Sequence, residues 1–150
     1  MKAIIETIPH EQQVYETCGD WRFENGSGLP MTQKAAMQNI DNNDSVLRIR
    51  VSKLGDYRYE MLIAVHELVE TLMCVHDGVQ VEDVDAFDKA FEAARDDGNE
   101  DEPGDDPKAP YVRQHCVATA VERLLCSELG CNWDKYCRLI LALPKIPAKE

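Results

Sequence analysis

The longest hydrophobic pattern of the chain runs from residue 57 to residue 76. At about 100° per residue, apolar side chains cover most of the circumference of a helix drawn through this segment. The polar side chains fall on one narrow stripe of that helix. The pattern predicts a central, buried helix that is capped by Asp56 and stopped by Gly78. The stripe consists of Glu60, His66, Glu67, Glu70 and Thr71.

Shorter patterns before this helix indicate β-strands. Residues 3–8 are mostly apolar, and residues 46–51 alternate apolar with basic side chains, as a half-buried strand does. Residues 14–17 and 21–23 flank the turn residues 18–20, which predicts a hairpin. We therefore expect a small N-terminal antiparallel sheet.

The remaining segments predict further helices and one long loop. Apolar periodicity indicates helices over residues 81–95, 111–129 and 132–143. Residues 96–110 form an acidic loop, because they are too rich in glycine and proline for regular structure. Residues 31–45 are polar and indicate no single element. The apolar residues that we expect to pack the helix over 111–129 against the central helix are Val112, Val117, Val121, Leu124 and Leu125.

Together these elements predict an α+β fold, in which a small N-terminal antiparallel sheet is followed by about four helices. A chain of 150 residues suits one domain with a workable core. Its expected parts are residues 1–55 as mainly strands and turns, 56–95 as helices, 96–110 as the acidic loop and 111–143 as helices.

Acidic side chains are concentrated in one segment of the chain. Residues 82–106 hold 12 of the 28 acidic residues and two basic ones, so most of the formal net charge of −12 lies there. We expect no direct nucleic-acid binding, because that requires a basic surface. The segment is either a solvated loop, an imitation of nucleic acid, or a surface for a basic protein partner.

The expected location is the cytoplasm. No run reaches the roughly 18 apolar residues that a membrane span requires. The first residues carry one positive charge and an early acid, unlike a secretory signal.

None of the six cysteines forms a C-x-x-C pair, so we expect reduced thiols and no thiolate zinc site. A disulfide between Cys126 and Cys131 is the alternative.

The run His66-Glu67-Leu68-Val69-Glu70 gives the central helix a candidate metal site. An imidazole and a carboxylate four residues apart lie on one helical face, so both can reach one ion. Zinc binds nitrogen and oxygen ligands in a tetrahedron, and a catalytic site leaves one position for water. The carboxylate of Glu67 points partly aside, where it can take a proton from that water. His66 and Glu70 are therefore candidate ligands and Glu67 is the candidate general base.

A third ligand has to come from another element, and His115 is the first candidate. It opens the helix over 111–129, and Glu122 follows seven residues later, only about 20° away around that helix. Seven residues span about 10 Å of helix, so Glu122 can orient His115 only if the chain bends. Glu122 is instead a further ligand or the partner of a group on the central helix.

His76 is a rival third ligand. With His66 and Glu70 it reproduces the i, i+4, i+10 offsets of the metzincins. Those enzymes have a turn-forming glycine at i+7, where this chain has Met73. On a continuous helix His76 also lies off the polar stripe, so His115 fits better.

Two other interpretations of these polar residues remain open. In the first, the stripe is only the solvated side of an amphipathic helix, and His115 is a surface residue. In the second, Glu67, Glu70, Asp85 and Asp88 hold magnesium, which prefers hard oxygen ligands. Their spacing is similar to the paired acids of all-α nucleotide pyrophosphatases, although that family normally has Glu-x-x-Asp as its second pair and lacks the N-terminal strands.

The central helix resembles the active-site helix of zincin-like metallohydrolases, with the motif HExxE in place of HExxH. This resemblance implies zinc bound by His66 and Glu70, with Glu67 as base. The family has histidine at the position of Glu70. The glutamate in this chain argues against proteolytic activity more than it argues against metal binding. Four short stretches are also similar to small uncharacterised proteins of phages and their hosts, which implies no particular activity: Pro9-His10, Gly19-Asp20-Trp21, Pro110-Tyr111 and Gln114-His115.

The sequence therefore predicts a divalent-metal-binding protein, and with Glu67 as base a zinc-dependent hydrolase of the peptidase or amidase type. One alternative is a non-catalytic, acidic phage interaction protein that uses residues 82–106. The other is a magnesium-dependent nucleotide pyrophosphohydrolase. The expected metal-site residues are His66, Glu70, His115 and Glu122.

Overall fold

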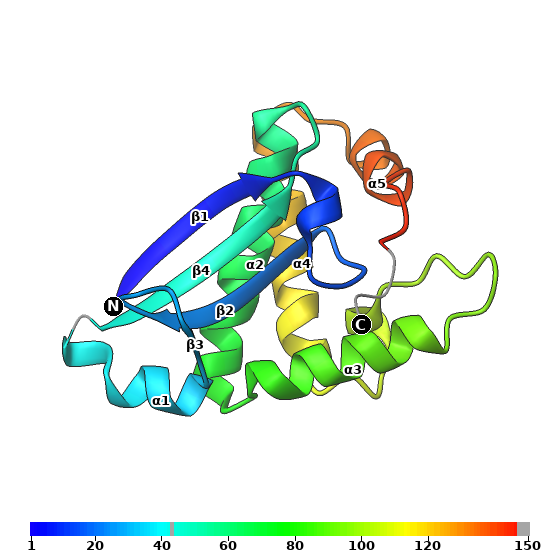
Figure 1. Cartoon of the computed structure of the whole chain (residues 1–150). Helices are drawn as coiled ribbons and strands as arrows, with labels where there is room; N and C mark the ends of the chain where they lie inside the picture. Colours follow the sequence, from blue (N-terminus) through cyan, green and yellow to red (C-terminus); the bar gives the residue numbers. More distant parts are fainter. Residues whose placement is uncertain (43, 147–150) are drawn as a thin grey trace.

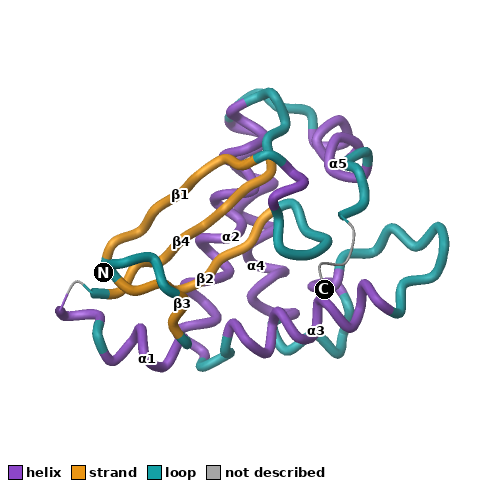
Figure 2. The backbone as a smooth tube through the Cα atoms, in the orientation of Figure 1, coloured by secondary structure: helices purple, strands orange, loops and turns teal. Residues whose placement is uncertain are grey.

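The computed structural model of the chain describes residues 1–42 and 44–146. A sheet forms one layer, and helices cover one of its faces (Figure 1). The strands, orange in Figure 2, all lie within the first 52 residues, whereas most of the rest of the described chain is helical. This arrangement confirms the expected α+β class with an N-terminal sheet.

The sheet has four strands. They are β1 (Lys2–Ile8), β2 (Gly19–Asn25), β3 (Pro30–Met31) and β4 (Ser45–Ser52). Their order is β1-β4-β2-β3, with β1 parallel to β4 and β2 antiparallel to both β4 and β3. The sheet is thus mixed and not purely antiparallel. The sequence pattern shows which side chains face the core, but it carries no information on the direction in which two strands pair.

The expected hairpin around residues 18–20 does not form. Gly19 and Asp20 belong to β2, and residues 14–17 are irregular. β2 pairs with the distant strand β4, in a register that sets Trp21 beside Ile49. Burial of these large apolar side chains in the core outweighs the local turn preference on which the hairpin prediction was based.

The two central strands have one apolar and one charged face. On the charged face, Arg50 donates a hydrogen bond to Asp20 over 3.0 Å, and Arg48 donates one to Glu24 over 2.7 Å. On the other face, side chains are buried in one core with Leu62 of the following helix. These core residues are Trp21, Phe23, Leu47, Ile49 and Val51.

Five helices complete the described chain. They are α1 (Gln33–Gln38), α2 (Tyr57–Asp77), α3 (Val81–Ala93), α4 (Val112–Glu128) and α5 (Trp133–Leu141). Four of them were expected, and α1 is the addition. It begins where the side chain of Thr32 accepts a hydrogen bond from the backbone N–H of Ala35, an N-cap within the polar segment that indicated no element. Short 3-10 turns occur at His10–Gln12, Ile40–Asn42 and Pro103–Asp105.

α2 is the central helix of the fold. Asp56 caps it by accepting from the N–H of Arg58 over 3.0 Å, and Gly78 ends it with a φ of 77°, both as expected. α2 crosses the sheet and lies along α4 (Figure 1). Although α2 is long, no helix among the described residues combines the length and apolar character that a membrane span needs.

α4 packs against α2 as expected, but with a different face. Val117, Val121 and Leu124 were expected in this contact, yet they are exposed. The prediction failed because it counted apolar periodicity, whereas the polar groups of the two helices are buried against each other. The buried residues of α4 are Gln114, His115, Ala118, Glu122 and Cys126.

All six cysteines are free thiols. The alternative of a bond between Cys126 and Cys131 is therefore not observed. These two residues bracket the end of α4, where the N–H of Cys131 donates to the carbonyl of Cys126 over 2.9 Å. Backbone hydrogen bonding, and not a disulfide, closes this turn.

Candidate metal centre

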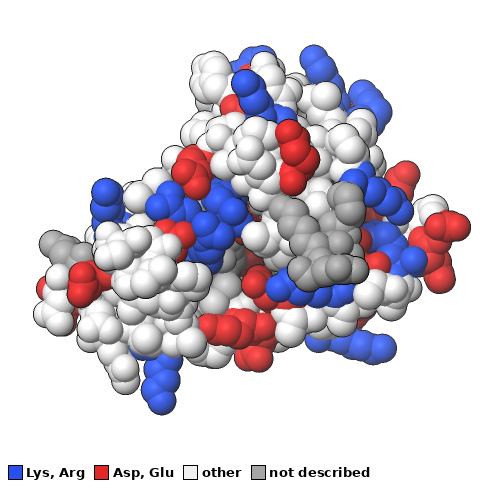
Figure 3. Space-filling model, viewed as in Figure 1, with Lys and Arg blue, Asp and Glu red and all other residues white. Residues whose placement is uncertain are grey.

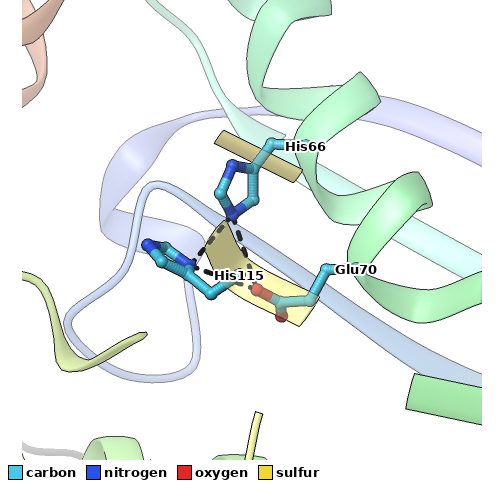
Figure 4. A group of neighbouring side chains, drawn as sticks. All are labelled: His66, Glu70 and His115. Carbon is cyan, nitrogen blue, oxygen red and sulfur yellow. Dashed lines mark hydrogen bonds and ion pairs between the residues drawn. The ribbon is translucent and has the colours of Figure 1, made fainter. Parts of the chain in front are cut away.

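Three side chains from two helices converge at the α2–α4 contact. His66 and Glu70 come from α2, and His115 comes from the first turn of α4 (Figure 4). His66 Nε2 lies 3.2 Å from His115 Nδ1 and 3.5 Å from Glu70 Oε2, and His115 Nδ1 lies 3.3 Å from Glu70 Oε2. The three atoms therefore form a nearly equilateral triangle.

The size of this triangle suits a zinc ion. Bond lengths of about 2.0–2.1 Å in a tetrahedron place neighbouring ligand atoms about 3.3 Å apart. The observed edges of 3.2–3.5 Å match that spacing. Two imidazoles and one carboxylate are also a donor set that zinc accepts, and three protein ligands leave a fourth corner for water.

Glu122 lies on the outer side of His66. Its Oε2 accepts a hydrogen bond from His66 Nδ1 over 2.9 Å, and its Oε1 accepts one from the hydroxyl of Tyr136. An ionised carboxylate can only accept in this contact, so Nδ1 carries a proton and Nε2 is the ring nitrogen that faces the cluster. Burial lowers the pKa of His66, but the contacts with Glu122 and Glu70 raise it more, well above its ordinary value. Of the two roles expected for Glu122, the geometry matches the partner of a group on the central helix. Its carboxylate contacts the nitrogen that points away from the triangle.

The loop after α3 supports the other imidazole. His115 Nε2 lies 3.2 Å from Glu102 Oε2 and 3.7 Å from Asp105 Oδ1. The backbone of Gly104 lies so close to the imidazole that an added Cβ would overlap the ring. Burial lowers the pKa of His115, but Glu102 and Glu70 raise it more, to about 9.

Glu70 is held by contacts to both of its carboxylate oxygens. The indole N–H of Trp21 donates to Oε1 over 3.3 Å, and Oε2 faces the two imidazoles. Burial raises the pKa of Glu70, but His115 and His66 lower it more, to about 2. The strand β2 thus contributes to the orientation of a candidate ligand on α2.

Glu67, the candidate base, is buried beside β2. An added Cβ at Gly19 would lie 2.6 Å from Glu67 Oε1, so the close approach of this strand requires glycine. Burial and the neighbouring Glu70 carboxylate raise the pKa of Glu67 well above its ordinary value. A raised pKa is what a carboxylate needs to accept and release a proton near neutral pH.

A cleft of about 810 Å³ gives access to these groups. His66, Glu67, Glu70 and His115 all line it. The cleft extends from them along β2 and α3 to the acidic loop, where Asp96 and residues 98–104 line it. Its volume is in the range of small-molecule and substrate sites.

The other candidate ligands lie elsewhere. The side chain of His76 is 86% exposed, so the metzincin-like arrangement is not formed. Asp85 and Asp88 line the cleft and face the hydroxyls of Tyr15 and Tyr111. Among the described residues, the four carboxylates of the magnesium interpretation do not gather into one ligand cluster.

Several residues at the site received no role from the sequence. They are Gly19, Trp21, Glu102, Gly104 and Tyr136. Trp21 and Tyr136 offered one signal, because a buried indole or phenol usually hydrogen-bonds to a partner. Nothing in the sequence pattern connects the glycines to particular side chains, since that depends on how the helices and strands pack.

Substitution of Gly104 by alanine should destabilise the fold through His115. The added methyl group overlaps the imidazole, whereas the backbone of Gly104 does not require a positive φ. In a His115→Ala background the methyl group has room, so its effect should shrink by about 0.5–3 kcal/mol. Denaturant unfolding of the four proteins of this cycle measures the difference. Equal destabilisation in both backgrounds would show that Gly104 does not position His115.

Asp88 should give unfolding a distinctive pH dependence. Burial raises its pKa from 3.8 to about 7, so the folded protein holds a proton that the unfolded chain releases. Wild-type stability should therefore fall between about pH 4 and pH 7 relative to Asp88→Asn, by at most about 1.4 kcal/mol per unit. Denaturant unfolding across this range provides the comparison. Parallel curves for the two proteins would contradict the raised pKa.

No family model, curated protein or solved structure matches this chain. The similarities to zincin-like metallohydrolases and to phage proteins therefore remain predictions. The geometry of His66, Glu70 and His115 is the basis for a functional assignment.

Proposed function

We propose that the protein binds zinc, or a similar divalent cation, through His66 Nε2, Glu70 Oε2 and His115 Nδ1. The observation that carries this proposal is their mutual spacing of 3.2–3.5 Å, which equals that of three corners of a zinc tetrahedron. The Glu122 partner of His66 matches the arrangement usual in zinc sites, where a carboxylate holds the second ring nitrogen. Glu102 lies 3.2 Å from the second ring nitrogen of His115.

The hydrogen positions strengthen the argument for a cation. Glu122 keeps a proton on the outer nitrogen of His66, and Glu102 favours one on the outer nitrogen of His115. When both rings are neutral, the two inner nitrogens present lone pairs to each other over 3.2 Å, beside an oxygen of Glu70. Three acceptors at this distance repel unless a proton or a metal ion lies among them. A proton bridges two of them well, whereas a metal ion satisfies all three.

The negative charge around the cluster also favours a bound cation. Glu67, Glu70 and Glu122 are all buried at the α2–α4 contact or beside it. Within the described part of the chain, no lysine or arginine forms an ion pair with any of them. The three carboxylates thus depend on the imidazoles of His66 and His115 for positive charge, and a divalent ion among the ligands would supply that charge at one fixed position.

We further propose hydrolysis of an amide or peptide bond at this cluster. Held by His66, Glu70 and His115, zinc would supply the Lewis acidity that activates water and a carbonyl group. Glu67 lines the same cleft and accepts the proton of the attacking water. As the water oxygen bonds to the carbonyl carbon and the C–N bond breaks, Glu67 passes that proton to the departing amine.

Metal content tests the ligand assignment. Wild-type protein equilibrated with zinc and then desalted should retain about one ion per chain, as measured by elemental analysis. His66→Ala and His115→Ala should each lose most of it, because two ligands hold zinc poorly. His76→Ala is the matched control, since this exposed histidine on α2 should be dispensable. Full retention of zinc by both cluster variants would rule out the proposed ligands.

The substitution Glu67→Gln tests the proposed chemistry. It should keep the zinc and the fold but lower hydrolysis of amide and peptide substrates by about 10²- to 10⁴-fold, because an amide cannot accept the proton. Rates are compared with wild type on a substrate panel, together with elemental analysis of both proteins. Loss of zinc from Glu67→Gln would make this residue a ligand, and unchanged turnover would remove it from the mechanism.

A further inference from the structure

The charged side chains that line the cleft holding the cluster are mostly acidic. Twelve of its lining side chains are acidic and three are basic, namely Lys89, Arg95 and Lys145. Arg95 is occupied by Glu92 and by backbone carbonyls of the acidic loop. Figure 3 shows acidic side chains gathered over that loop and near the start of α3. The cleft therefore presents a negative potential to a substrate.

Asp85 and Asp88 form a distinct corner of this cleft. They lie three residues apart on α3, and the hydroxyl of Tyr15 lies 3.4 Å from an oxygen of each. Tyr15 has one hydroxyl hydrogen and can donate it to only one of them at a time. Tyr111 donates to the other oxygen of Asp88. The two carboxylates thus have more acceptor capacity than their neighbours supply.

The protein places a cation of its own beside this corner. The ammonium group of Lys89 lies 3.9 Å from Asp85 Oδ2 and 5.3 Å from the centre of the Tyr15 ring. An aromatic face next to a carboxylate is a favourable environment for ammonium and guanidinium groups. The side chain of Lys89 is 55% exposed, so a ligand can displace it without leaving a charge buried.

A second observation connects this corner with the proposed reaction centre. Glu67 is nine-tenths buried and lines the cleft, and no described side chain or N–H donates a hydrogen bond to its carboxylate. Glu67, Asp85 and Asp88 all act on Tyr15, whose pKa burial and these acids raise well above its ordinary value. Tyr15, Glu67, Asp85 and Asp88 thus all line one cleft, in which the hydroxyl of Tyr15 contacts the acidic pair.

We infer that Asp85 and Asp88, with the ring of Tyr15, bind a protonated amine or guanidinium group of the substrate. The inference rests on the proposed function for the position of the scissile amide, which would lie beside Glu67. The substrate class is then an amide or short peptide that carries a basic group. Charge complementarity excludes phosphorylated and other polyanionic substrates from this cleft.

Two probes that match in shape but differ in charge test the inference. Nα-acetyl-arginine amide and Nα-acetyl-citrulline amide have nearly the same shape, but only the first is a cation. Their dissociation constants are measured by NMR titration at about pH 8, above the pKa of about 7 that burial gives Asp88, and at about 150 mM salt, with zinc-loaded and with metal-free protein. The arginine probe should bind at least about tenfold more tightly, with the largest shifts near Tyr15, Asp85 and Asp88.

Paired variants show where the preference arises. In Asp85→Asn/Asp88→Asn the preference for the arginine probe should disappear, while the amide introduced in place of Asp88 still offers an oxygen to the hydroxyl of Tyr111. Glu11→Gln/Glu128→Gln removes the same charge from exposed positions outside the cleft and should leave the preference intact. Circular dichroism confirms that both proteins fold.

The outcomes separate this inference from the proposed function. Equal binding of the two probes, or equal loss of the preference in both double variants, would overturn the inference. A preference that depends on Asp85 and Asp88 supports it, whether or not zinc is present. Failure of zinc binding to His66, Glu70 and His115 would be seen separately, in the metal content.

Discussion

The contact between α2 and α4 is built from ionisable side chains, and much of the fold is arranged to supply their partners. Buried charges are tolerated only when they are paired or bind a metal. Here the imidazole of His66 is held from α4 by Glu122, and the imidazole of His115 faces Glu70 on α2. The two helices cannot slide or rotate relative to each other without breaking both contacts.

This constraint explains features that apolar packing alone does not. α4 buries its polar face and leaves Val117, Val121 and Leu124 exposed, because the partners of His66 and Glu70 lie on the polar face. β2 approaches α2 closely at Gly19, and its Trp21 donates to Glu70. The acidic loop also contacts this cluster, because Gly104 lies against the ring of His115. Sheet, loop and helices therefore meet at one polar cluster.

Local patterns in the sequence predicted the parts that depend on local physics. The limits of α2 followed from Asp56 and Gly78, and the helical spacing of His66 and Glu70 placed both on one face. His115 was chosen by type and position, and the structure brings it within 3.3 Å of Glu70. Strand direction, the exposed face of α4 and the contacts of Gly104 depend on long-range packing, so periodicity could not reveal them.

The position of a bound ion tests the central claim most directly. Crystals of the protein grown with zinc, measured above and below the zinc absorption edge, locate the ion without assumptions about its ligands. The account predicts one strong anomalous peak within about 2.0–2.2 Å of His66 Nε2, Glu70 Oε2 and His115 Nδ1. The absence of an anomalous peak among these three atoms, or zinc bound only at surface carboxylates or cysteines, would contradict the proposed metal site.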